Sequence, residues 1–97
     1  MKTLIDKKVV IRGYYCGNWI GELEAITTMD CKTVILKDAY RLWSWKTKQG
    51  VSLSEIAVNG VSEGTIPCAV PKVVLTDCYE IIEATEAAYE SVKSTAK

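Results

Sequence analysis

The chain of 97 residues contains no histidine and no phenylalanine, and it has only two prolines. Its four cysteines are scattered without a close pair, at Cys16, Cys31, Cys68 and Cys78. Zinc sites usually combine cysteine and histidine at short spacings, so this pattern argues against a metal site. A nucleophile elbow and a glycine-rich phosphate loop are also missing from the sequence. We therefore expect a protein that is not an enzyme and that carries no cofactor.

The chain has no excess of charge of either sign, because twelve basic residues balance twelve acidic ones. Binding to duplex DNA relies on a surplus of Lys and Arg facing phosphates, so duplex nucleic acid is not the expected partner. A small anionic ligand remains compatible with this balance, since one or two local positive groups are enough to bind it. No apolar run is long enough to span a bilayer, and residues 1–8 lack the apolar core of a signal peptide. We expect a cytoplasmic protein without a membrane partner.

The length predicts a single domain over residues 1–97. A chain of this size buries roughly 60–70% of the surface that its unfolded form exposes, which makes a thin core. Self-association would help such a core.

The first half of the chain predicts three antiparallel strands. Residues 7–15 are rich in β-branched and aromatic side chains, and residues 19–26 alternate apolar with polar. The turn signal at residues 16–18 joins them into a hairpin. Residues 32–46 predict a long third strand with a bend near Asp38 and Ala39, where the inward face changes. Together these segments form a three-stranded meander.

The second half predicts two helices and a later strand. Ser52 and Glu55 have the spacing of a capping box, which starts a short helix near 53–58, and residues 59–60 end it. A loop at 61–67 precedes a strand at 71–76 that continues as extended chain to about residue 82. A C-terminal helix over 85–95 follows. One alternative is a single helix from Asp77, because apolar residues between 78 and 92 recur at helical spacing.

These elements predict an α+β fold. Its antiparallel sheet occupies residues 9–82 and combines the three-strand meander with the later strand. A short middle helix and a C-terminal helix complete it.

The segment 38–46 holds two of the three tryptophans and one of the two arginines. In an extended strand Arg41, Trp43 and Trp45 lie on one face. An arginine beside indole rings can bind an anion and stack a flat ring, which suits a nucleotide. The alternative is that the tryptophans simply fill the core of a chain without phenylalanine. Arg41 is the stronger functional candidate, because arginine is rarely buried without a partner.

Arg12 and Tyr14 share a face of the first strand and form a second candidate pair for a nucleotide pocket. The alternative is an arginine on a solvated face with a tyrosine at its rim. The carboxylates Glu80, Glu83 and Glu86 drift around a helix instead of converging, so a solvated acidic face is the better interpretation.

The sequence resembles a family of small proteins encoded by phages and prophages. The motifs are V-V-I-R-x-Y from Val9, V-I-L-K-D-A-Y-R-L-W-S-W from Val34, and S-L-S-E-I-A-V-N-G-V from Ser52. Two later segments fit in the same order, A-V-P-K-V-V-L-T-D and Y-E-I-I-E-A-T-E-A-A. The likeness covers roughly residues 9–88. It departs at Glu83, where the family pattern leads us to expect proline.

This family resembles the Thoeris anti-defence sponge proteins, which bind immune cyclic nucleotides without cleaving them. The resemblance implies glycocyclic ADP-ribose isomers as ligands and cyclic trinucleotides, of the kind used in CBASS immunity, as a further class. It also implies homo-oligomers, dimers or hexamers, with pockets between subunits. Arg12 and Arg41 would contact phosphates, and Tyr14, Trp43 and Trp45 would stack on bases.

Two other functions fit the same residues. The protein could be an interaction module that binds and inhibits a host enzyme through its tryptophan-rich sheet, or a small nucleotide phosphodiesterase. Recovery of a bound nucleotide after heating separates the three: intact ligand indicates a sponge, degraded ligand an enzyme, and no ligand the interaction module.

Overall fold

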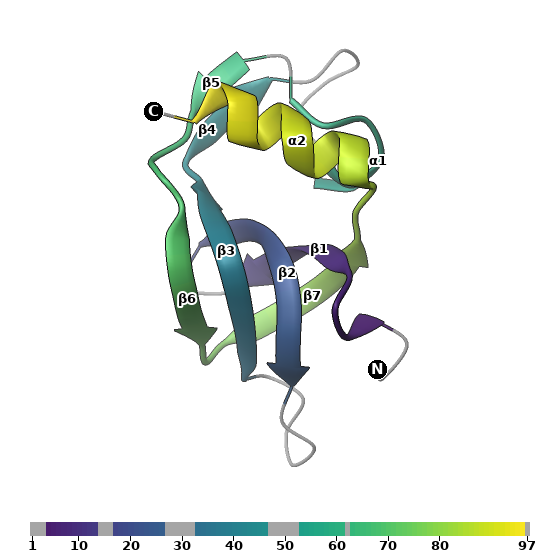
Figure 1. Cartoon of the computed structure of the whole chain (residues 1–97), viewed down its shortest axis with the longest axis vertical. Coiled ribbons are helices and arrows are strands. Elements are labelled where there is room, and N and C mark those ends of the chain that lie inside the picture. Colours follow the sequence, from purple (N-terminus) through teal and green to yellow (C-terminus); the bar gives the residue numbers. More distant parts are fainter. Residues whose placement is uncertain (1–3, 14–16, 27–32, 47–52, 62, 97) are drawn as a thin grey trace.

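The computed structural model describes residues 4–13, 17–26, 33–46, 53–61 and 63–96. Their elements, in chain order, are β1 (Lys8–Gly13), β2 (Asn18–Ile26), β3 (Val34–Leu42), β4 (Ser44–Lys46), α1 (Leu53–Asn59), β5 (Glu63–Thr65), β6 (Val70–Leu75), β7 (Cys78–Glu83) and α2 (Glu86–Thr95). Five strands form one antiparallel sheet in the order β6-β3-β2-β1-β7, and β4 pairs with β5 (Figure 1). The predicted α+β class, with a short middle helix and a C-terminal helix, is confirmed.

The predicted meander corresponds to β1, β2 and β3, and its third strand bends where the sequence indicated. Asp38 has a positive φ of 48°, and the register between β2 and β3 shifts between Ile20 and Glu22. A residue inserted in this way changes which face the following side chains occupy. Leu36 and Tyr40 consequently belong to different hydrophobic clusters.

The single long strand predicted over residues 32–46 is wrong at its C-terminal end. β3 stops at Leu42, and β4 leaves the main sheet to form a two-stranded ribbon with β5. The predicted loop at 61–67 therefore contains a strand. This strand forms because Trp45 of β4 pairs with Gly64 of β5. Local propensity does not reveal such a pairing between segments distant in the sequence.

The segment from residue 70 to 83 forms two strands, β6 and β7, so the sheet has one strand more than predicted. The chain reverses around Thr76 and Asp77, and β7 returns to pair with β1. In that pairing Ile81 lies opposite Ile11. The alternative of a single helix from Asp77 is therefore wrong.

Hydrophobic residues fill two clusters on opposite faces of the sheet. β1 and β7 cross behind β2, β3 and β6, and a strand core fills the space between them (Figure 1). Its buried members are Val9, Ile11, Trp19, Leu23, Val34, Leu36, Ala39, Leu75 and Cys78. A helix-side core lies under α1 and α2 and contains Val10, Ile20, Tyr40, Leu42, Ile56, Ala57, Val61, Ile66, Ala84, Tyr89 and Val92.

Thr85 starts α2 and ties it to α1. Its hydroxyl accepts a hydrogen bond from the Ala88 N–H at 3.0 Å and donates one to the Val58 carbonyl at 3.0 Å. The first satisfies a free N–H of the helix N-terminus, which stabilises a helix by about 1 kcal/mol. The predicted start of α2 is confirmed, whereas Ser52 and the side chain of Glu55, the predicted capping box of α1, lie outside the described residues. Neither helix is long and apolar enough to cross a bilayer.

Candidate functional site

Arg41 lies at the end of β3 and is held against the indole of Trp19. The register aligns Ile11, Trp19 and Arg41 across three strands, so their side chains share one face. The guanidinium carbon of Arg41 is 4.5 Å from the centroid of the Trp19 ring. Trp19 is only 5% exposed, so it offers a fixed aromatic surface, whereas Arg41 is half-buried and reaches solvent. Such a cation–π contact orients the guanidinium before any ligand arrives.

Trp43 lies just beyond Arg41, between β3 and β4, and points into solvent. Its side chain is 68% exposed, although the preceding Leu42 is 3% exposed and belongs to the helix-side core. The alternative that Trp43 fills the core is therefore wrong. Trp19 is the tryptophan that does so. The backbone of Trp45 lies in β4, but its side chain is outside the described part of the structure.

Arg12 projects from the opposite face of the sheet. Arg12 on β1 lies opposite Asn18 on β2, and Asn18 lies opposite Leu42 on β3. Because Leu42 belongs to the helix-side core, Arg12 lies on that face of the sheet. Its Nε lies 3.8 Å from Oε1 of Glu80, and both side chains are about half exposed. The structure therefore does not bring Arg12 and Arg41 together within one chain. Tyr14, the predicted companion of Arg12, lies outside the described residues.

The acidic residues of the C-terminal part lie on the surface, as the sequence predicted. Glu80, Glu83, Glu86 and Glu90 are all exposed, the first two on β7 and the others on α2. Within the described ranges no group of three or more Cys, Asp or Glu side chains could hold a metal ion. Burial raises the pKa of the Cys78 thiol, which keeps it protonated and unreactive at neutral pH.

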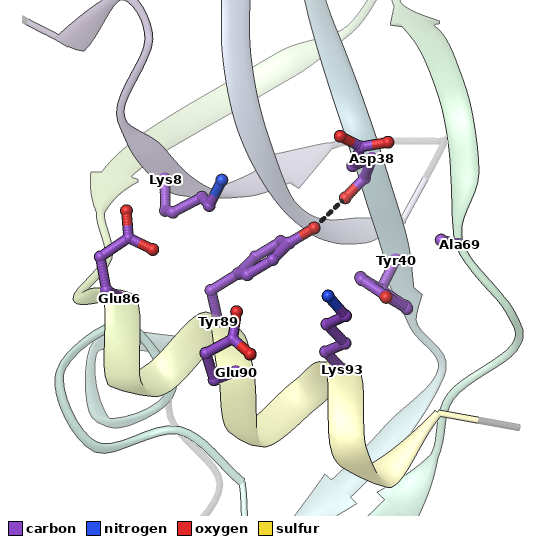
Figure 2. A pocket seen from close by; sticks show the side chains of 8 residues that line it. All are labelled: Lys8, Asp38, Tyr40, Ala69, Glu86, Tyr89, Glu90 and Lys93. Atoms are coloured by element: carbon purple, nitrogen blue, oxygen red, sulfur yellow. Dashed lines mark hydrogen bonds between the residues drawn. The ribbon is translucent and has the colours of Figure 1, made fainter.

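A cavity of about 420 Å³ lies between α2 and the sheet (Figure 2). Its lining residues come from β1, β3, α2 and the segment before β6: Lys8, Asp38, Tyr40, Ala69, Glu86, Tyr89, Glu90 and Lys93. None of the predicted ligand-binding residues whose side chains the structure describes lines this cavity. The available signal was the helical spacing of Glu86, Tyr89, Glu90 and Lys93, which places them along one side of α2.

Tyr89 forms the floor of this cavity and connects α2 to the bend in β3. Its hydroxyl donates a hydrogen bond to the carbonyl oxygen of Asp38 at 2.6 Å (Figure 2). The Lys8 ammonium lies 4.4 Å from the centroid of the Tyr89 ring, and the ring of Tyr40 meets it edge-on at 5.8 Å. The bond to Asp38 fixes the inserted residue that turns β3.

The charge of Lys8, one of the lining residues, is partly compensated by Glu22 on β2. Oε1 of Glu22 is 3.2 Å from the Lys8 ammonium, and Oε2 is 3.1 Å from that of Lys37. Hydrogen bonds from Lys37 and Lys8 lower the pKa of Glu22 below its ordinary value. The carboxylate therefore stays charged through the neutral range.

Tyr89 makes stability depend on pH in the alkaline range. Burial, reinforced by Tyr40 and Asp38, raises its pKa to about 12 from 10.0. The native state thus keeps a proton that the unfolded chain loses, so this contribution is complete below pH 10 and falls as the pH rises toward 12. At neutral pH we expect Tyr89→Phe to cost about 1 kcal/mol, the value of one hydrogen bond.

Urea denaturation of both proteins from pH 8 to 12 measures this effect, and their stability difference should narrow above pH 10. A difference that stays constant across this range would show that the hydroxyl proton does not stabilise the fold.

A family model described as a domain of unknown function, DUF6948, matches residues 6–92. No curated protein and no solved structure matches the chain. The match spans all five strands of the main sheet and most of α2. It includes Arg41 and every lining residue of the cavity except Lys93. The chain belongs to the DUF6948 family of domains of unknown function.

Proposed function

We propose that this protein binds and sequesters a cyclic nucleotide signal without cleaving it, as a phage-encoded anti-defence protein in the host cytoplasm. The observation that supports the proposal is the Arg41 guanidinium held on the buried Trp19 ring beside the exposed Trp43. A planar guanidinium pairs with phosphate oxygens through two parallel hydrogen bonds. An exposed indole stacks on a base, which is worth roughly 1–3 kcal/mol.

Sequestration relies on affinity, and affinity gains from groups that are already ordered. Arg41 loses little side-chain freedom on binding, because Trp19 holds it in place in the free protein. The resemblance to Thoeris sponge proteins supplies the ligand class, glycocyclic ADP-ribose isomers and cyclic trinucleotides. Both carry phosphates and flat rings, which are the groups that Arg41 and Trp43 suit.

The proposal includes self-association. Arg41 is half-buried and Trp43 is exposed, so the two side chains form part of an open surface. A second copy placed over this surface would enclose a nucleotide between subunits, as the resemblance implies for dimers or hexamers. Light scattering measures the oligomer mass with and without ligand.

The test is a retention experiment. Purified protein is mixed with a glycocyclic ADP-ribose isomer or, in a parallel sample, with a cyclic trinucleotide. Each sample is freed of unbound ligand by filtration and heated to denature the protein. We expect mass spectrometry to recover the ligand intact and in a fixed ratio to the protein. Degraded ligand would indicate a phosphodiesterase, and the absence of retained ligand for both nucleotide classes would refute sequestration.

The second candidate is a protein-interaction module, and the exposed aromatic residues favour it. Trp43 is 68% exposed and Tyr79, on the edge strand β7, is 71% exposed. Tryptophan, tyrosine and arginine are the residues that contribute most to protein interfaces. Failure of the retention test, together with capture of a host enzyme that Trp43→Ala abolishes, would establish this function instead.

A further inference from the structure

The cavity under α2 is lined by charges of both signs. Among the described residues no ion pair engages Asp38, Glu86, Glu90 or Lys93, whereas Lys8 is already paired with Glu22 at 3.2 Å. The lining includes three carboxylates and two ammonium groups, a formal charge of −1. This excess of carboxylates would repel phosphates. The cavity is therefore unsuited to the nucleotide proposed for Arg41.

The cavity also contains a hydroxyl group, on Tyr40. Tyr40 is only 6% exposed, and within the described part of the chain its hydroxyl has no hydrogen-bond partner. Tyr40 is one of the residues that line the cavity, so its hydroxyl lies at or near the space that a ligand would fill. A phenol can both donate and accept there.

The charges are separated along the cavity. Along α2 the charged lining residues follow in the order Glu86, Glu90 and Lys93, and in the view of Figure 2 Glu86 lies toward Lys8 and Lys93 toward Tyr40. Glu86 and Lys93 are seven residues apart on α2, which corresponds to a rise of about 10 Å. One end therefore presents the Lys93 ammonium and the Tyr40 ring. The other presents the Glu86 and Glu90 carboxylates and the Lys8 ammonium, whose charge Glu22 compensates.

We propose that this cavity binds a small basic amino acid or a molecule of the same chemistry. Such a ligand has one carboxylate, a cationic side chain and an overall net charge of +1. The carboxylate would pair with Lys93 and accept a hydrogen bond from Tyr40. The cationic end would pair with Glu86 and Glu90, while the Lys8 ammonium stays over the Tyr89 ring and paired with Glu22. The volume of about 420 Å³ lies within the range of small-molecule sites and leaves room for a ligand of this size.

Titration of the isotope-labelled protein with L-lysine and L-arginine, followed by NMR, tests the proposal. We expect saturable shifts of the amides of Tyr40, Tyr89 and Lys93 with at least one of the two. Cadaverine, which lacks the carboxylate, and L-glutamate, which reverses the net charge, should each bind at least about ten-fold more weakly. No saturable binding of either basic amino acid, or equal binding of cadaverine or glutamate, would overturn it.

Two variants locate the site. Tyr40→Phe keeps the ring in the helix-side core and removes only the hydroxyl, so we expect weaker lysine binding without a loss of stability. Lys93→Gln should weaken lysine binding and leave cadaverine binding unchanged. Lys72→Gln is the matched control, because Lys72 lies on the edge strand β6 and pairs with Glu24 at 3.1 Å. An equal effect of Lys72→Gln and Lys93→Gln would overturn the placement.

Discussion

Arg41→Ala should lower the affinity for a cyclic nucleotide by about ten- to a hundred-fold, since hydrogen bonds to charged groups are worth about 1.5–3 kcal/mol. The loss should appear mainly as faster dissociation, because the guanidinium is already oriented on Trp19 before the ligand binds. Stability should change less, as Arg41 is only half-buried. Calorimetry and a thermal melt on the same preparation measure the two effects.

Arg12→Ala is the matched control for this prediction. Arg12 also lies on a strand of the sheet, but on the opposite face and beside Glu80 at 3.8 Å. If the nucleotide binds at the Arg41 surface within one subunit, Arg12→Ala should leave the affinity for the cyclic nucleotide within about two-fold of that of the unmodified protein. Arg41→Lys keeps the charge but loses the planar fork, so it should recover only part of the affinity. Unchanged affinity in a folded Arg41→Ala protein would place the nucleotide elsewhere.

Elements defined by local chemistry could be predicted from the sequence. The hairpin of β1 and β2, the bend at Asp38 and the start of α2 at Thr85 each depend on neighbouring residues. The ribbon of β4 and β5 could not, because two three-residue strands gain their hydrogen bonds only from each other.

The candidate site was predictable only in part. Alternation indicates which side chains share a face, but not which face other elements will cover. It therefore could not distinguish Trp19, which the sheet encloses, from Trp43, which remains exposed. It also could not reveal the cavity, whose walls come from β1, β3 and α2 and exist only once α2 packs on the sheet.

Gly60→Ala should destabilise the protein by about 3 kcal/mol, a large share of the 5–15 kcal/mol typical of a domain. Gly60 has a φ of +78°, which costs any residue with a Cβ roughly 1–2 kcal/mol. An added Cβ would also collide with Oγ of Ser91 and lie 3.1 Å from Cα of Ala88. The Ser91 hydroxyl accepts a bond from the Val61 N–H at 3.0 Å and donates one to the Ala88 carbonyl at 2.7 Å. Moving it would weaken both.

Gly17→Ala separates the two causes, since Gly17 has nearly the same φ, +82°. There the added Cβ meets only the flexible end of Arg41, at 3.1 Å from Nη1. We expect a loss of about 1–2 kcal/mol from backbone strain alone. Adding Ser91→Ala to Gly60→Ala should recover part of the loss, because it removes the colliding oxygen. Urea midpoints measure all three proteins, and equal losses at the two glycines would show that the α1–α2 contact tolerates a larger residue. The larger loss at Gly60 follows from its position, where α2 leaves no room to move.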